Sequence, residues 1–320
     1  MKQLESDLRA TLGPDAVQRD EPLARYTALR IGGPADLLVV ANSLPTLREA
    51  VLLAWEHEVP CRLLGAGSNV LVSDAGVRGL VVINRARAIT FHERPADDEA
   101  DEPPFVEAES GASMSTLARL CIKRGLAGLE WAIGIPGTVG GAVVGNAGAW
   151  GGNVASTLES ATILQATGEV VEWPVQRFEY GYRTSLLKRI SIDYSRSCKD
   201  SHSVVCLARF ILQRRDVAWL ESRAAEITVQ RKASQPKGAT CGSVFKNPEG
   251  DHAGRLIEAA GLKGQRSGAA EISLVHANFV INHGGATAAD IKSLIDLARE
   301  RVWTQFQVSL ELEIELLGEW

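Results

Sequence analysis

Continuous apolar runs alternate with an amphipathic stretch in the first part of the chain. ADLLVVA (35–41) is a compact apolar run, which is typical of a buried strand. Ser43 follows it and can cap a helix that begins near Pro45, because apolar residues then recur on one helical face. CRLLG (61–65) and GLVVIN (79–84) predict the next strands. This alternation of strands and a helix predicts a small α/β unit.

The rest of the chain has a strand-rich middle and a helix-rich end. Apolar runs predict several strands within 155–215, and a charged helix follows. A later helix begins at Thr287, where Asp290 fits a capping box. HANFVIN (276–282) and LELEIELLG (310–318) predict strands. The predicted divisions are two subdomains at 1–90 and 91–216, a further domain at 217–308, and a C-terminal strand at 309–320.

Composition excludes several classes of protein. The chain has 320 residues, 45% of them hydrophobic and 23% charged, so it can bury a large core and wholesale disorder is excluded. The net charge of −5, without a basic stripe, argues against a nucleic-acid partner. The start, MKQLESDLRATLG, predicts a short amphipathic helix and no signal peptide, and no apolar window is long enough to cross a membrane.

The cysteines and histidines predict a reducing compartment and no metal site. The five cysteines form an odd set without a C-x-x-C pair, which favours reduced thiols over a disulfide framework. The six histidines lack the spacing of metal ligands. We therefore expect a cytoplasmic protein without a bound metal.

A glycine-containing turn follows one of the predicted strands. In LLGAGSNVLVSD (63–74), the strand runs into a turn of small residues at 65–69. Val70 occupies the place of the third glycine of a dinucleotide fingerprint and no helix pattern follows, so a doubly wound nucleotide fold is a poor match. The turn still suits an anion, because consecutive small residues let several backbone N–H groups converge on a phosphate.

A second glycine segment is GLEWAIGIPGTVGGAVVGNAGAWGG (128–152). It carries almost no side-chain bulk across fifteen positions, so it cannot build a core of its own. Such a run suits backbone that lies against a large flat group, or two elements that pack very closely. For either segment alone, packing or a tight turn is the commoner explanation, whereas two segments with adjacent polar donors make cofactor binding and packing about equally plausible.

Five motifs occur in an order that resembles a known family. They are LLGAGSNVLVSD, IGIPGTVGGAVVGNAGAWGG, YGYRTSLLK (180–188), CGSVFKNP (241–248) and LELEIELLG (310–318). With these motifs the chain resembles the UDP-N-acetylenolpyruvoylglucosamine reductases, flavoenzymes of bacterial cell-wall synthesis, from about Tyr26 to the C-terminus. No clear tyrosine-bearing loop is present, which favours the subclass that lacks it, and Tyr194 is the remaining candidate for that role.

The resemblance implies an α+β fold. Two α/β subdomains of the vanillyl-alcohol-oxidase type would bind FAD without a covalent bond, and a C-terminal α+β domain would bind the substrate. The FAD pyrophosphate would lie against the first glycine segment and the ring system against the second. The implied cofactor-binding residues are Gly65, Ala66, Gly67, Ser68, Asn69, Val70, Gly134, Ile135, Pro136, Gly137, Thr138, Gly140, Gly141, Ala142, Asn146, Ala147, Gly148 and Ala149.

The resemblance also implies a reaction and three catalytic positions. In this family NADPH reduces FAD, and hydride then passes to the enolpyruvyl ether of UDP-N-acetylglucosamine enolpyruvate, which gives UDP-N-acetylmuramate. Negative charge builds beside the substrate carboxylate and has to be stabilised before a proton arrives. Arg183 would bind the carboxylate, Glu313 would hydrogen-bond the developing enolate, and Ser243 would protonate the carbon. Because Glu313 must then carry a proton, we expect its pKa to be raised.

Without the resemblance, these three residues have ordinary explanations. Arg183 would be a surface arginine, Ser243 a turn residue, and Glu313 part of a solvated strand face where Glu and Leu or Ile alternate. The same motifs supply three further candidates, which would line the substrate site or contact UDP: Tyr182, Lys246 and Asn247. His276 and Asn278 are interpreted as structural, with His276 kept as a minor candidate for the site.

Two other functions stay open at this point. One is a flavin oxidase or dehydrogenase of the same fold that acts on a small alcohol or hydroxy acid. The other is a catalytically silent UDP-sugar-binding protein, which would keep both glycine segments and lose the three catalytic residues. We expect a monomer with a small-molecule substrate and no nucleic-acid or membrane partner.

Overall fold

The computed structural model describes residues 1–93, 103–192 and 203–320, so that Tyr194 lies outside the described residues. The chain forms two compact units, and each is described by itself. Unit 1 comprises Met1–Ala16, Val39–Gly65 and Val82–Gln230, and unit 2 comprises Val17–Leu38, Ala66–Val81 and Arg231–Trp320. Within the described ranges, no helix is both long and apolar enough to cross a membrane.

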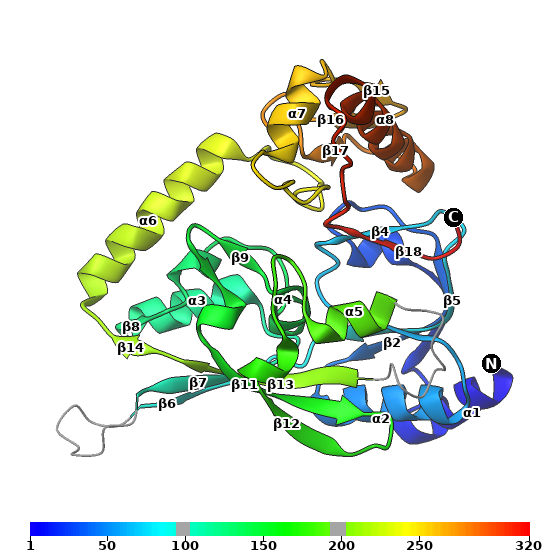
Figure 1. The fold of residues 1–320 in the computed structure, drawn as a ribbon. Coiled ribbons are helices and arrows are strands. Elements are labelled where there is room, and N and C mark those ends of the chain that lie inside the picture. Colours follow the sequence, from blue (N-terminus) through cyan, green and yellow to red (C-terminus); the bar gives the residue numbers. More distant parts are fainter. Residues whose placement is uncertain (94–102, 193–202) are drawn as a thin grey trace. The chain divides into compact units, whose positions relative to one another are not determined.

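An antiparallel five-stranded sheet with the order β12-β11-β13-β7-β6 is the centre of unit 1. Helix α4 packs on β13 and β7, and α3 lies on the same side of the sheet (Figure 1). Buried apolar side chains from the sheet and these helices form one core, among them Leu117, Val143, Ile163 and Phe210. The elements are β6 (Ile89–His92), β7 (Phe105–Glu109), α3 (Met114–Lys123), α4 (Val139–Gly145), β11 (Leu158–Gln165), β12 (Val170–Pro174) and β13 (Ser203–Ile211).

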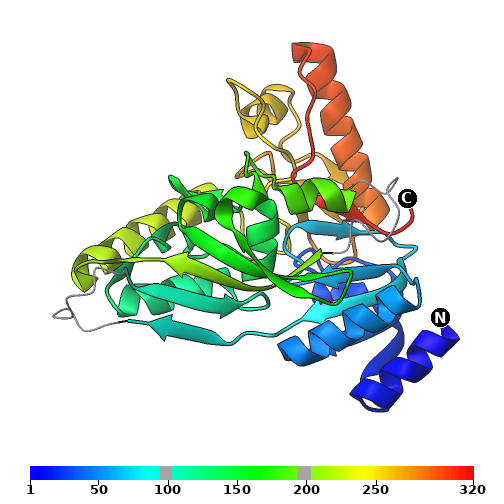
Figure 2. The ribbon, with the colours of Figure 1, turned by 60° about the horizontal axis from the view of Figure 1, so that its bottom comes forward.

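Two helices of unit 1, α1 (Lys2–Leu12) and α2 (Leu44–Glu56), pack against each other (Figure 2). The hydroxyl of Ser43 accepts a hydrogen bond from the Thr46 N–H at 3.3 Å, so the predicted helix cap is confirmed. The predicted strands are also present, in a four-stranded sheet with the order β1-β2-β5-β3. Its strands are β1 (Val17–Pro22), β2 (Pro34–Ala41), β3 (Cys61–Leu64) and β5 (Val77–Asn84).

In unit 2, α8 packs against a three-stranded antiparallel sheet, β15-β16-β17, and α7 packs against α8 (Figure 1). The predicted capping box of α8 is confirmed, because Thr287 and Asp290 exchange side chain to backbone hydrogen bonds. Only the last three residues of the predicted strand HANFVIN pair as a strand. The elements are α7 (Ala253–Ala259), β15 (Arg266–Ser267), β16 (Ala270–Ile272), β17 (Val280–Asn282) and α8 (Ala288–Phe306).

The prediction of a C-terminal strand across residues 309–320 is mostly wrong. Only β18 (Glu315–Leu317) is a strand, and it runs parallel to β4 (Val70–Val72). The chain bends at Glu313 and Ile314, whose N–H groups both donate to the carbonyl of Val244, at 2.9 and 3.4 Å. Two amides that converge on one carbonyl cannot continue a regular ladder, so the alternating pattern ends as a strand there.

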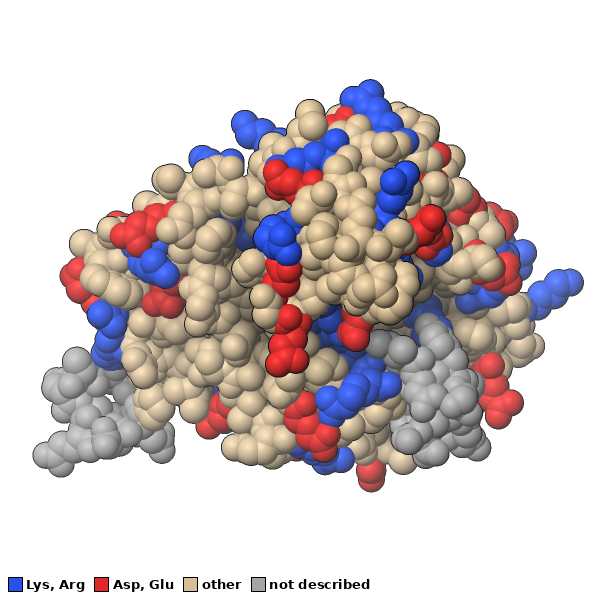
Figure 3. Space-filling view, turned by 45° about the horizontal axis from the view of Figure 1, so that its top comes forward, with Lys and Arg blue, Asp and Glu red and all other residues tan. Residues whose placement is uncertain are grey.

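The remaining elements lie between the parts described above in the sequence. The glycine run, for which the sequence predicts no element, contains α4, and the predicted charged helix is confirmed as α6. Acidic and basic side chains are interspersed on the face drawn in Figure 3. The remaining elements are η1 (Leu23–Tyr26), β8 (Leu126–Ala127), η2 (Glu130–Ala132), β9 (Gly148–Ala149), β10 (Gly152–Asn153), η3 (Val154–Ser156), η4 (Val175–Phe178), α5 (Leu186–Ile192), β14 (Gln213–Arg214) and α6 (Val217–Ser234).

Candidate active site

The turn that leads into β4 leaves several backbone donors unused. Across the described part of the chain, the backbone N–H groups of residues 66–69 have no hydrogen-bond acceptor. Gly67 adopts a left-handed φ of 57°, and a Cβ on it would lie 2.2 Å from the carbonyl oxygen of Tyr26. Consecutive free amides around a left-handed glycine form a concave site for an anion. The turn therefore fits a pyrophosphate.

Gly65, at the start of the first glycine segment, lies against Thr138 of the second segment within unit 1. A Cβ on Gly65 would lie 2.4 Å from Oγ1 of Thr138, so glycine is needed there for close approach. Thr138 is the N-cap residue of α4, and its hydroxyl accepts from the Gly141 N–H at 3.5 Å. The first two amides of α4, those of Val139 and Gly140, donate to the carbonyls of Ala112 and Ser110 at 2.8 Å each. Because these two amides already donate to carbonyls of the protein, they are not available to an anion. The free donors of the 66–69 turn are therefore the better anion site.

The glycines of the second segment divide into packing positions and open positions. A Cβ on Gly140 would lie 2.9 Å from Cβ of Ser110, and one on Gly152 would lie 2.4 Å from the Trp131 ring. A Cβ on Gly145 would meet nothing within 4 Å, and one on Gly141 would meet only Thr138, at 3.7 Å. Close packing therefore explains some glycines of the run, such as Gly140 and Gly152, whereas Gly141 and Gly145 leave open space for a bound group. The open, low-bulk side fits a large planar group such as a flavin ring.

The other predicted cofactor residues occupy varied surroundings. The amide of Asn146 is fully used, since Nδ2 donates to the Gly181 carbonyl at 2.9 Å and Oδ1 accepts from the Ala155 N–H at 3.1 Å. Ala142 and Val70 are buried, Ile135 and Ala147 pack against the core of unit 1, and Gly148 and Ala149 form β9. Gly134 and Gly137 have positive φ angles of 70° and 122°, and Gly134 and Pro136 are exposed.

Arg183 lies at the tip of a tight hairpin in unit 1. Gly181 and Thr184 exchange backbone hydrogen bonds at 3.1 and 3.3 Å, so Tyr182 and Arg183 form a two-residue turn. Arg183 has a φ of 56°, which is uncommon for a residue other than glycine, and its guanidinium lies 5.8 Å from the exposed Tyr182 ring. Such conformations persist only where the surrounding structure imposes them, and they cluster at functional sites.

In unit 2 the structure brings Ser243 and Glu313 onto neighbouring segments. Ser243 pairs with Phe279 on one side, while the next residue, Val244, accepts the Glu313 N–H at 2.9 Å on the other. Nδ2 of Asn69, from the turn with free amides, donates to the Glu313 carbonyl at 3.1 Å. The predicted acid, the predicted proton donor and the predicted anion site are therefore connected by hydrogen bonds.

The remaining candidates of unit 2 all have protein partners. Nζ of Lys246 lies 3.2 Å from Glu311, and Oδ1 of Asn247 accepts from the Ala253 N–H at 3.1 Å. Nδ1 of His276 accepts from the Asn278 N–H at 3.2 Å, and burial lowers the pKa of His276, as a structural histidine would show. The side chain of Asn278 both donates to and accepts from the Phe245 backbone, at 2.8 and 2.9 Å.

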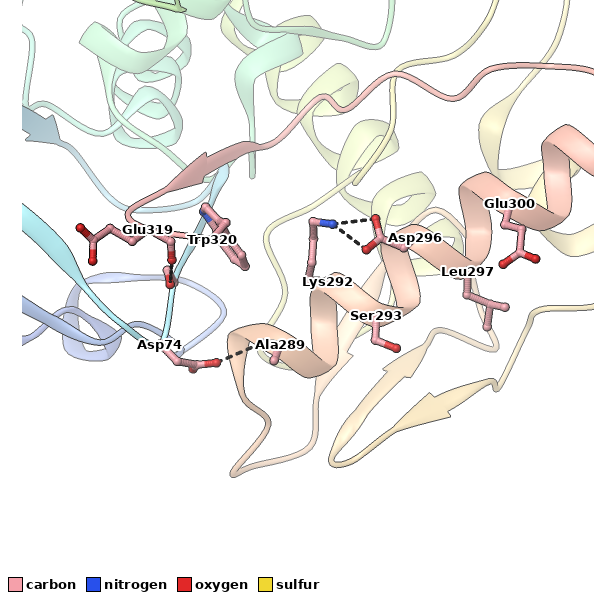
Figure 4. Close-up of a pocket in the computed structure, with 10 residues that line it drawn as sticks. Asp74, Ala289, Lys292, Ser293, Asp296, Leu297, Glu300, Glu319 and Trp320 are labelled. Carbon is pink, nitrogen blue, oxygen red and sulfur yellow. Dashed lines mark hydrogen bonds and ion pairs between the residues drawn. The ribbon is translucent and has the colours of Figure 1, made fainter. Parts of the chain in front are cut away.

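A separate hollow in unit 2, of about 690 Å³, contains none of the predicted residues (Figure 4). It is lined by the first turns of α8 and by the C-terminal residues Glu319 and Trp320. Three of its charged side chains have partners within the protein: Asp74 accepts from the N–H groups of Ala288 and Ala289 at 2.9 and 3.0 Å, and Lys292 pairs with Asp296. This hollow is an anchoring point of α8 and is distinct from the candidate site.

Two residues that hold the Arg183 hairpin were not predicted from the sequence. Tyr180 and Ser185 flank the turn, and their hydroxyl groups donate to the carbonyls of Val143 and Val144 at 2.9 and 2.6 Å. The available signal was the pair of hydroxyl residues at the two ends of YGYRTS. That signal is weak, because only the fold shows that both hydroxyls reach the same helix end.

Comparisons with known proteins bear on both units. A family model described as "FAD binding domain" matches residues 35–173, and one described as "UDP-N-acetylenolpyruvoylglucosamine reductase, C-terminal domain" matches residues 234–317. The chain is 44% identical over 306 residues to the UDP-N-acetylenolpyruvoylglucosamine reductase of Chloroflexus aggregans, covering 95% of this chain and 98% of that protein. It is 39% identical over 313 residues to that of Geobacillus thermodenitrificans, covering 98% and 96%.

A solved structure gives the same result. The crystal structure of UDP-N-acetylenolpyruvylglucosamine reductase from Thermus caldophilus matches with a TM-score of 0.75 and 35% identity, covering 94% of this chain and 99% of that chain. The expected α+β fold with an FAD-binding portion is confirmed. These matches extend over nearly the whole length of both partners, and the chain belongs to the UDP-N-acetylenolpyruvoylglucosamine reductase family.

Proposed function

We propose that this chain reduces UDP-N-acetylglucosamine enolpyruvate to UDP-N-acetylmuramate, with FAD as cofactor and NADPH as hydride donor. Family membership supports the FAD-dependent reduction. The structural observation that carries the proposal is the hydrogen-bonded connection of Asn69, Glu313 and Val244, the neighbour of Ser243. This connection would set an acid and a proton donor beside a turn that suits a phosphate.

FAD, once bound, supplies the hydride chemistry. The free amides of residues 66–69 would hold its pyrophosphate, and the open glycine side of α4 would lie against its ring. Both surfaces are formed largely by backbone and by residues of low bulk, which supports this placement.

Arg183 would bind the substrate carboxylate. The guanidinium is planar and permanently charged, so it can form two parallel hydrogen bonds to a carboxylate. As the double bond is reduced at its terminal carbon, negative charge moves onto the adjacent carbon and the carboxylate. A fixed cation stabilises that charge more in the transition state than in the ground state, which lowers the barrier.

Glu313 and Ser243 would complete the reduction. A protonated Glu313 would donate a hydrogen bond to the developing enolate, and the Ser243 hydroxyl would then transfer its proton to the carbanionic carbon. The new C–H bond forms from this proton, and the serine oxygen recovers a proton from solvent. We propose no role in these steps for the other carboxylates of the 310–318 segment.

Anaerobic absorption spectroscopy tests this function. The purified protein should show flavin absorbance that bleaches on addition of NADPH and recovers on addition of the enolpyruvyl UDP-sugar. UDP-N-acetylglucosamine, which lacks the double bond, should bind without restoring the absorbance. A colourless protein that cannot be reconstituted with FAD, or recovery with neither sugar, would sink the proposal.

The proposal also includes surroundings and assembly. A UDP-sugar is a small, soluble substrate, and the four described cysteines (Cys61, Cys121, Cys206 and Cys241) are free thiols, as is usual in a reducing compartment. We propose a cytoplasmic enzyme that acts as a monomer. Light scattering on the FAD-bound protein measures the molecular mass, for which the expected value is that of one 34.4 kDa chain.

A further inference from the structure

The C-terminal end of α4 is attached to both legs of the hairpin that presents Arg183. Before the turn, the Tyr180 hydroxyl donates to the Val143 carbonyl at 2.9 Å. After the turn, the Ser185 hydroxyl donates to the Val144 carbonyl at 2.6 Å. At the turn itself, Nδ2 of Asn146 donates to the Gly181 carbonyl at 2.9 Å.

Two of these contacts engage carbonyls at the C-terminal end of α4. The last carbonyls of a helix have few donors within the helix, so Val143 and Val144 can accept from the hairpin, and Val143 also accepts the Asn146 N–H at 3.5 Å. Ser185 is fully buried and Tyr180 is partly buried, and Tyr180 stacks on Phe178 with ring centroids 5.3 Å apart. Burial raises the pKa of Tyr180, so its hydroxyl stays protonated and keeps donating.

The same contacts account for the backbone conformation of Arg183. A left-handed φ at a long side chain costs free energy and is maintained only when both flanks are fixed. Here one flank is fixed by Tyr180 and the other by Ser185, which also accepts the Lys188 N–H at 3.1 Å at the start of α5. The backbone that carries Arg183 is thereby fixed relative to α4, whose open glycine side suits the flavin ring.

We propose that Tyr180, Ser185 and Asn146 are positioning residues that fix Arg183 relative to α4. The proposal rests on the proposed role of Arg183 as the group that binds the substrate carboxylate. In this proposal Tyr180 and Ser185 act through the hairpin and not by contact with the substrate, whereas Asn146 is also one of the implied cofactor-binding residues. A small displacement of a charged catalytic group is enough to lower a rate by one to two orders of magnitude.

Tyr180→Phe is the sharpest single test, because it removes one oxygen atom and keeps the ring stacked on Phe178. We expect flavin reduction by NADPH to stay within about twofold of wild type, and recovery by the enolpyruvyl UDP-sugar to slow by about tenfold or more. Affinity for UDP-N-acetylmuramate, whose carboxylate Arg183 would also bind, should fall in parallel when measured by calorimetry. Ser160→Ala is the matched control, since it also removes a buried hydroxyl of unit 1, one that donates to Glu172 on the sheet. It should leave both half-reactions and the product affinity unchanged.

A double-mutant cycle shows whether the effect passes through Arg183. In an Arg183→Ala background, adding Tyr180→Phe should change the recovery rate by less than about twofold, because the positioned group is already gone. Equal effects of Tyr180→Phe in both backgrounds would overturn the positioning role, as would a wild-type recovery rate in the single variant. If Arg183→Ala itself recovers at the wild-type rate, the proposed role of Arg183 fails and the positioning role fails with it.

A second variant covers the case in which Tyr180→Phe does not fold or loses FAD. Ser185→Ala removes the donor to the Val144 carbonyl on the other leg of the hairpin, together with the acceptor for the Lys188 N–H. The expected result is the same selective loss in recovery and the same non-additivity with Arg183→Ala. An equal slowing of both half-reactions would overturn the proposal.

Discussion

The two units hold their candidate catalytic residues in different ways. In unit 1, side chains that are near neighbours of Arg183 in sequence attach its hairpin to the end of one helix. In unit 2, Ser243 and Glu313 lie on extended segments joined mainly by backbone hydrogen bonds, and Asn69 reaches Glu313 across 244 positions of the chain. We therefore expect a single hydroxyl deletion to displace Arg183, whereas the Ser243 and Glu313 pair is held by backbone hydrogen bonds that no side-chain deletion removes.

The largest expected effect comes from removing the acid of unit 2. Glu313→Ala should keep FAD and bleach normally with NADPH, but its recovery with the enolpyruvyl UDP-sugar should slow by about 10²- to 10³-fold, the usual cost of losing one donor to a developing oxyanion. Glu313→Gln keeps an N–H donor and should slow less. Stopped-flow absorbance measures both steps, and equal recovery rates for the two variants would contradict a donor role.

Asn278→Ala probes the backbone connections of unit 2. Its side chain satisfies both the N–H and the carbonyl of Phe245, and Asn278 is 3% exposed. Deleting it leaves two buried backbone groups unpaired, so the free energy of unfolding should fall by about 2–4 kcal/mol in a urea titration. Asn153→Ala, which removes an exposed cap in unit 1, should cost below about 1 kcal/mol. Equal losses of unfolding free energy in the two variants would show that the buried contacts of Asn278 stabilise the protein no more than the exposed cap at Asn153.

Two glycine substitutions separate packing from cofactor contact in unit 1. Gly152→Ala places a Cβ 2.4 Å from the Trp131 ring and should lower stability by about 1–3 kcal/mol. Gly145→Ala meets nothing within 4 Å, so it should leave the stability of the FAD-free protein unchanged and weaken FAD binding. Thermal unfolding without FAD and fluorescence titration with FAD distinguish the two. Unchanged FAD affinity in Gly145→Ala would remove this glycine from the cofactor surface.

The smallest expected effect is a pH dependence carried by one carboxylate in each unit. Hydrogen bonds from Arg266 lower the pKa of Glu271 in unit 2. In unit 1, burial acts to raise the pKa of Glu107, but the contacts from Arg209 and His92 outweigh it and lower the pKa. A pKa below the unfolded value means that each group stabilises the folded state above about pH 4.5 and loses this contribution as the pH falls through the folded pKa. Glu271→Gln and Glu107→Gln should each flatten the acid side of a stability curve by under about 1 kcal/mol.

The starts of several helices could be predicted because the residues that form each cap lie close together in the sequence. The caps of α2 and α8 need only Ser43, Thr287 and Asp290, all of which bond to residues three positions away. By contrast, the Glu and Leu alternation of 310–316 gives the same pattern whether a segment pairs as a strand or bends. The bend at Glu313 depends on Val244, which is distant in sequence, and no local pattern contains that partner.

The glycine run (128–152) is a second segment whose sequence pattern does not determine its structure. Its composition indicates low bulk but does not reveal α4, whose ends are set by Thr138 as N-cap and by Asn146 in a left-handed conformation. Nor does composition distinguish Gly140 from Gly145, since one is packed against Ser110 and the other faces open space. The candidate catalytic residues were predicted from motif resemblance. The part that Tyr180 and Ser185 play in holding the Arg183 hairpin could be found only from the structure.

The parallel pairing of β18 with β4 has a consequence for synthesis on the ribosome. Residues 66–81 emerge early, but their strand β4 receives its partner only when residues 315–317 have been translated. Unit 1 is complete by residue 230 and can begin to fold while unit 2 still lacks its last strand and Glu313. A nascent or truncated chain that stops before residue 313 therefore carries Arg183 without the acid it would work with, so activity is expected only from chains translated beyond residue 317.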